Sequence, residues 1–288
     1  MIESFPREIR VALLLAGISA LMYGAGDFCG GLGVRKSPLI SVLAISQLTG
    51  LILAVIAAVV LRQPFPNGRD LLWGMVGGVC GAAGLAGLYT AIATTPVAVA
   101  SPVAAVTGAV IPVLLGFAGG ERPATLAWVG IALALPAIVL LSAGRAAKGQ
   151  ESLVRKAVIL GLTAGLGFGL FFFAIAHTAH TSGLWPLVSA RVATLSLIVV
   201  YAGIARQSLV PRREGVLPIL LSGMLDMSAN IAFLLASRVG MLTLAAVVTS
   251  LYPGPTVILA LIFYRERLTL PRIAGLLLAL AGVALISV

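Results

Sequence analysis

The sequence predicts an all-α integral membrane protein of ten transmembrane helices, arranged as two inverted five-helix repeats. Three observations predict it: an apolar composition, ten apolar runs separated by short polar breaks, and an internal repeat. Of the 288 residues, 60% are hydrophobic and 10% are charged, and the mean hydropathy is +1.13. Soluble domains carry about 25% charged residues, so this composition excludes a water-soluble fold.

The apolar runs have the length of membrane spans, because about 20 residues of helix cross the hydrocarbon core of a bilayer. The expected spans are residues 11–33, 39–61, 70–93, 97–117, 125–143, 156–177, 184–204, 216–237, 241–263 and 271–288. The breaks between them are short and hold turn and charge signals, such as Arg35-Lys36-Ser37-Pro38. We therefore expect no soluble domain between spans.

The net charge of +10 comes from 19 Lys and Arg residues that fall almost entirely in these breaks. This distribution is typical of topology signals and not of a nucleic-acid-binding face, so the expected partners are the lipid bilayer and a small-molecule substrate. Breaks on the side of the termini hold six of these residues and the opposite breaks hold twelve, which places the termini outside the cytoplasm.

Enzyme chemistry is disfavoured. No GxxxxGK[ST], HExxH or GxSxG motif occurs, and the two cysteines, Cys29 and Cys80, lie singly inside apolar runs. We expect no catalytic residues, no metal site and no cofactor.

The internal repeat has an offset of 145 residues. Glu121-Arg122 recurs as Glu266-Arg267, Gly130 recurs as Gly275, and Tyr23-Gly24 corresponds to Phe168-Gly169. The repeats are residues 1–146 and 147–288. Because each contains five spans, the second must be inverted in the membrane, and inverted repeats are typical of secondary transporters with a substrate site near the midplane.

Proline and glycine mark candidate hinges. Pro253-Gly254-Pro255 is the strongest break within a span, since each proline removes a backbone hydrogen bond. Together with Gly24 and Gly169, Pro253 and Pro255 form the predicted hinge set. Simple close packing through small residues is the alternative explanation for the glycines.

The duplicated five-helix pattern, with Glu-Arg opening the last helix of each half and a glycine nine residues beyond the Glu, resembles the EamA type of the drug/metabolite transporter superfamily. The resemblance covers the whole chain. It implies a cavity between two bundles, alternating access, and export of small metabolites, commonly amino acids, across a bacterial inner membrane. The general likeness is to the aromatic amino acid exporter branch. One departure is that Pro253 corresponds to a position near Gly108 in the first half, which argues against a symmetric hinge.

Charged residues at membrane depth are the main candidates for substrate binding, because burying them is costly. Asp226 lies near the middle of its span, with Asn230 one turn further along. They are either a substrate or proton site or a buried polar pair. Asp27 either serves the same site or reaches headgroups or Arg35. Arg191 either holds a carboxylate or snorkels to the interface.

Tyr23, Tyr89 and Tyr252 complete the predicted substrate site, since aromatic rings give apolar area with a polar tip. The predicted function is export of aromatic and other neutral amino acids. The alternatives are a transporter or channel for another solute or drug, or a scaffold without transport. Proton coupling through Asp226 or Asp27 and facilitated diffusion are both left open, and the sequence does not indicate an oligomeric state.

Overall fold

The all-α prediction is confirmed. A computed structural model describes residues 7–95, 97–142, 151–264 and 270–286, and no strand occurs in these ranges. The first half contributes α1 (Arg7–Lys36), α2 (Leu39–Val60), α3 (Gly68–Thr94), α4 (Val97–Ala118) and α5 (Thr125–Ser142). The second half contributes α6 (Glu151–Ala176), η1 (His180–Ser182), α7 (Trp185–Ile204), η2 (Arg213–Gly215), α8 (Val216–Val239), α9 (Leu242–Thr249), α10 (Pro253–Tyr264) and α11 (Leu270–Ile286).

The helices have the lengths of membrane spans. Within the described ranges, six segments are long and apolar enough to cross a bilayer: α1, α2, most of α3, α6, α7, and α8 with the preceding turn. Shorter apolar helices lie within α4 and α5. The expected span 241–263 is divided into α9 and α10.

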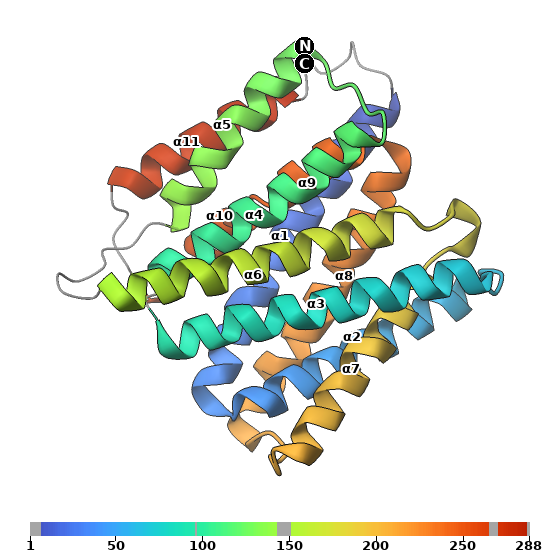
Figure 1. Cartoon of the computed structure of the whole chain (residues 1–288), viewed down its shortest axis with the longest axis vertical. Coiled ribbons are helices and arrows are strands. Elements are labelled where there is room, and N and C mark those ends of the chain that lie inside the picture. Colours follow the sequence, from blue (N-terminus) through green and yellow to red (C-terminus); the bar gives the residue numbers. More distant parts are fainter. Residues whose placement is uncertain (1–6, 96, 143–150, 265–269, 287–288) are drawn as a thin grey trace.

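Helix packing follows a two-fold relation between the halves. α1 packs along α8, and the counterpart of α1, α6, packs along α3, the counterpart of α8. Likewise α6 contacts α4 while α1 contacts α9 and α10. The pairs α2–α7 and α5–α11 join counterparts directly, and they lie at opposite ends of the long axis in Figure 1. The inverted five-helix repeats are thereby confirmed. The predicted boundary at residues 146 and 147 lies outside the described residues.

Two glycines let backbones touch at equivalent crossings. A Cβ on Gly78 of α3 would lie 2.8 Å from the carbonyl carbon of Ala190 on α7. A Cβ on Gly223 of α8 would lie 2.9 Å from the carbonyl carbon of Ser46 on α2. Thr194 on α7 also donates a 2.8 Å hydrogen bond to the Gly78 carbonyl. Small residues are therefore required where these helices cross.

The ninth span breaks where Pro253-Gly254-Pro255 predicts it. Leu251 and Tyr252 donate backbone hydrogen bonds to residues three positions back, 3.2 and 3.1 Å long, instead of continuing the helix. Pro253 is the first residue of α10, where its missing N–H is not needed. In the first half α4 runs unbroken from Val97 to Ala118, so the expected asymmetry is present.

Gly24 and Gly169 are equivalent contact points. A Cβ on Gly24 would lie 2.6 Å from both Pro255 Cβ and the Tyr252 carbonyl oxygen, and the Thr256 hydroxyl donates to the Gly24 carbonyl at 3.1 Å. A Cβ on Gly169 would lie 2.6 Å from Ile111 Cβ on α4. Both glycines permit close crossing, and their role as hinges stays a prediction.

Glu121 holds the start of α9. Its carboxylate accepts hydrogen bonds from the backbone N–H groups of Leu242 and Thr243, at 2.7 and 2.9 Å. These donors have no partner within the helix, and the positive end of the helix dipole favours the carboxylate. The loop before α5 is thereby fastened to the second half. Glu266, the repeat counterpart, lies outside the described residues.

We expect Gly78→Ala to destabilise the protein, because the added methyl meets the α7 backbone. Overpacking of this kind costs about 1–3 kcal/mol in the free energy of unfolding. Thermal unfolding of the detergent-purified protein measures it. Gly31→Ala is the matched control, since nothing lies within 4 Å of its added Cβ, and an equal loss in both variants would contradict the packing argument.

Glu121→Gln should lower the free energy of unfolding by about 0.5–2 kcal/mol, the range for lost helix caps. The oxygen of the new amide can still accept one of the two hydrogen bonds. Its NH₂ group would face the other backbone N–H, which then loses its acceptor. The same unfolding measurement on Glu151→Gln, an exposed acid on the first turn of α6, provides the comparison. If the two variants unfold alike, the carboxylate does not fasten α9.

Candidate functional site

A cavity of about 110 Å³ lies between the two halves of the molecule. Described residues of α1, α2, α3, α4, α6, α7, α8 and the α9–α10 break line it, whereas none from α5, α10 or α11 does so. A protein cavity of about 150 Å³ accommodates benzene, so the space suits part or all of one small organic molecule. The described residues of the α5–α11 pair therefore lie outside the cavity lining.

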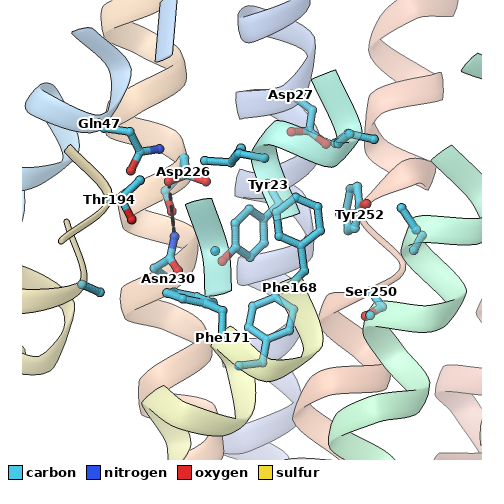
Figure 2. A pocket seen from close by; sticks show the side chains of 18 of the residues that line it. Tyr23, Asp27, Gln47, Phe168, Phe171, Thr194, Asp226, Asn230, Ser250 and Tyr252 are labelled. Atoms are coloured by element: carbon cyan, nitrogen blue, oxygen red, sulfur yellow. Dashed lines mark hydrogen bonds between the residues drawn. The ribbon is translucent and has the colours of Figure 1, made fainter. Parts of the chain in front are cut away.

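The cavity wall is chemically divided (Figure 2). The polar part comes from α1, α2, α7 and α8, and it consists of Asp27, Gln47, Arg191, Thr194, Asp226 and Asn230. The apolar part comes from α3, α4 and α6, and it consists of Gly81, Leu85, Leu88, Ala104, Ala105, Gly108, Phe168, Phe171 and Phe172. One solute can thus meet charged groups and aromatic rings at once.

The charged groups break the two-fold relation of the scaffold. At the repeat offset, Asp226 corresponds to Gly81, and Asp27 corresponds to Phe172. Arg191 corresponds to Ser46. The helices are duplicated, but the ionisable side chains in the cavity are not.

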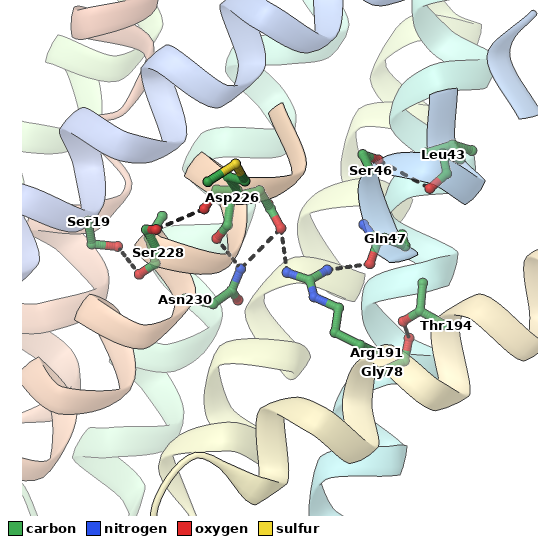
Figure 3. A network of polar contacts seen from close by, with 12 residues as sticks. Ser19, Leu43, Ser46, Gln47, Gly78, Arg191, Thr194, Asp226, Ser228 and Asn230 are labelled. Atoms are coloured by element: carbon green, nitrogen blue, oxygen red, sulfur yellow. Dashed lines mark hydrogen bonds and ion pairs between the residues drawn. The ribbon is translucent and has the colours of Figure 1, made fainter. Parts of the chain in front are cut away.

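Asp226 and Arg191, both predicted as site residues, form an ion pair (Figure 3). The other end of the guanidinium donates to the side-chain oxygen of Gln47 on α2. Asn230 donates from Nδ2 to the Asp226 backbone carbonyl at 2.7 Å and to its carboxylate at 3.3 Å. The predicted Asp226–Asn230 pair on one helix face is therefore present, and Gln47 extends it to a third helix.

The two members of the ion pair differ in exposure. The Arg191 side chain is 9% exposed, whereas the Asp226 side chain is 34% exposed. Arg191 does not snorkel to an interface but lies inward against Gly50, whose added Cβ would be 3.5 Å from Arg191 Nε. The carboxylate of Asp226 is consequently more accessible than the guanidinium of Arg191.

Asp27 lies on the cavity wall. It is exposed, one helical turn from Tyr23 on α1. Among the described residues no hydrogen-bond donor or cation is within bonding distance of its carboxylate.

Aromatic rings share the cavity wall with Asp27. The Tyr23 ring centre is 6.1 Å from that of Phe172 and 6.2 Å from that of Tyr252. Tyr252 lies in the break between α9 and α10, so a change at the break moves a cavity residue. The Tyr89 side chain lies outside the described part of the structure.

Several residues that line the cavity are not among those predicted from the sequence. Gln47 is a polar residue inside an apolar run, which is a usable signal of function at membrane depth. Phe168 is the repeat counterpart of Tyr23, so the repeat itself pointed to it. Phe171 and Thr194 carry no comparable signal. Within the described ranges no group of three or more His, Cys, Asp or Glu residues is placed to hold a metal ion.

Comparisons with known proteins agree with the duplicated fold. The sequence model described as the EamA-like transporter family matches residues 10–143 and again residues 155–288. An uncharacterized protein of Methanocaldococcus jannaschii is 27% identical over 134 residues, which are 46% of this chain and 96% of that protein. That relative is thus about one repeat long. A solved crystal structure of 16% sequence identity superposes with a TM-score of 0.80, covering 96% of this chain and 98% of the other, and shows the same fold.

Asp226 and Arg191 should be energetically coupled. Removing Asp226 as Asp226→Asn leaves the more buried charge unpaired, so it should destabilise more than Arg191→Gln. The double variant should be more stable than the sum of the single effects predicts, by about 0.5–3 kcal/mol. Thermal unfolding of the four proteins measures the coupling, and additive effects would refute it.

Proposed function

The chain belongs to the EamA-like transporter family, and on this premise we propose that it exports small metabolites, foremost aromatic and other neutral amino acids, by alternating access. The chain is a multi-pass membrane protein that carries small solutes. The proposal adds the substrate and the mechanism.

The division of the cavity wall into a polar and an apolar part is the main support for this proposal. Asp226 and Arg191 offer groups of both signs on one wall, and an amino acid presents an ammonium and a carboxylate. Phe168, Phe171 and Phe172 offer a surface for an apolar or aromatic side chain on the other wall. The cavity lies where the inverted repeats meet, which is the usual place for a transporter site.

The broken ninth span supports alternating access. Tyr252 in the break lines the cavity, and the same break contacts Gly24 on α1. A small change of angle between α9 and α10 would therefore alter both the cavity and a contact between the halves. Pro253, Pro255, Gly24 and Gly169 are the hinge residues of this proposal.

We propose that the protein lies in a bacterial inner membrane, as membership of the family suggests. We also propose that its termini lie outside the cytoplasm, as the distribution of Lys and Arg indicates. Export is driven either by proton antiport, with Asp27 and Asp226 as the carboxylates involved, or by the metabolite's own gradient.

Counterflow in proteoliposomes tests the proposal. Vesicles containing the full chain and preloaded with unlabelled phenylalanine, leucine, threonine, glutamate or lysine are supplied with trace labelled amino acid. A carrier should show transient accumulation with phenylalanine and leucine, and this signal should saturate. Asp226→Asn should reduce the initial rate about tenfold or more, equivalent to about 1.4 kcal/mol, because the guanidinium loses its carboxylate.

Thr163→Ala is the control, since this threonine is exposed on α6 and bonds only within its own helix. Flux without counterflow would indicate a channel. No flux for any amino acid would refute the substrate class, although not the family.

A further inference from the structure

The charge balance of the cavity indicates the charge of the substrate group that it favours. The ionisable groups among the described lining residues, apart from the tyrosines, are Asp27, Arg191 and Asp226. With two carboxylates and one guanidinium, the formal charge of this set is −1. Because Arg191 and Asp226 neutralise one another, the unbalanced charge is that of Asp27. The cavity therefore favours a cationic group.

Arg191, the cationic residue among these three, is also the least exposed of them. The Arg191 side chain is 9% exposed, and it is engaged by Gln47 on one side and Asp226 on the other. An incoming carboxylate would have to displace Asp226 from it and would also face the carboxyl group of Asp27. An incoming ammonium meets no such competition at Asp27.

The surroundings of Asp27 suit an organic ammonium. Tyr23 lies one turn away on the same face of α1, and its ring is 6.2 Å from that of Tyr252 (Figure 2). Aromatic faces attract organic cations, and a charge-assisted hydrogen bond to a carboxylate fixes the nitrogen. The phenylalanines of α6 offer an apolar surface to the rest of the same molecule.

We propose that the cavity recognises its substrate through a cationic amine bound to Asp27, and that a carboxylate on the substrate is dispensable. The inference rests on the proposed transport function and widens its substrate class. Aromatic and apolar amines that lack a carboxylate join the amino acids as ligands, and carboxylates without an amine bind more weakly than either.

Three matched probes separate the two groups of an amino acid. Phenethylamine carries the amine alone, 3-phenylpropanoate carries the carboxylate alone, and phenylalanine carries both. Isothermal titration of the full, detergent-purified chain with each probe measures binding and avoids passive leakage of the amine through a bilayer. We expect phenethylamine and phenylalanine to bind and 3-phenylpropanoate to bind at least about tenfold more weakly, since it lacks a partner for Asp27.

Asp27→Asn removes the charge and preserves the shape. It should weaken phenethylamine binding about tenfold or more, whereas Glu151→Gln on the exposed start of α6 should leave binding unchanged. The comparison of the three probes on the unaltered chain requires no variant, so the inference stays testable if Asp27→Asn fails to fold.

Tighter binding of 3-phenylpropanoate than of phenethylamine would overturn the inference. So would undiminished phenethylamine binding by folded Asp27→Asn. Amino acid counterflow without phenethylamine binding would refute this inference and leave the proposed function standing. Phenethylamine binding without flux of any amino acid would refute the proposed amino acid substrates and leave the amine site standing.

Discussion

Contact between backbones at two glycines underlies the geometry of the cavity. Gly78 meets the carbonyl of Ala190, directly before Arg191, and Gly223 meets the carbonyl of Ser46, directly before Gln47. Each close crossing therefore fixes the height and distance of a residue in the polar network. Lipid offers little hydrophobic gain for joining helices, so van der Waals contact at such crossings must hold the bundle together. A wider crossing would separate the guanidinium from the amide that holds it.

The network shows how a guanidinium is tolerated inside the membrane. Arg191 is largely covered, and the cost of covering it is offset by a carboxylate and an amide from two other helices. Asp226 is left partly facing the cavity, with Asn230 supporting its position. α2, α7 and α8 are thereby joined by charge-assisted bonds at the place where a solute would bind. A ligand that competed for Asp226 would therefore also weaken a contact between α7 and α8.

The sequence predicted much of the fold because its signals are local or periodic. Spans follow from apolar length, the inverted repeat from Glu121-Arg122 and Glu266-Arg267, and the break from Pro253-Gly254-Pro255. Asp226 and Arg191 were recognisable singly as charges at membrane depth, but their pairing depends on the crossing of α7 and α8 with α2, which no local pattern encodes. The hydrogen bonds between Glu121 and the start of α9 could not be predicted for the same reason, since the partners of Glu121 are backbone groups distant in sequence.

The unequal halves have a consequence for how such cavities evolve. If two identical single repeats paired about the same axis, every ionisable side chain of the shared cavity would occur twice. The formal charge of the cavity would then always be an even number. Joining the repeats in one chain removes this parity rule. Phe172 can stand where strict symmetry would place a second Asp27, and Gly81 where it would place a second Asp226. A fused chain can thus hold a single unbalanced charge, which a ligand with one opposite charge can neutralise completely.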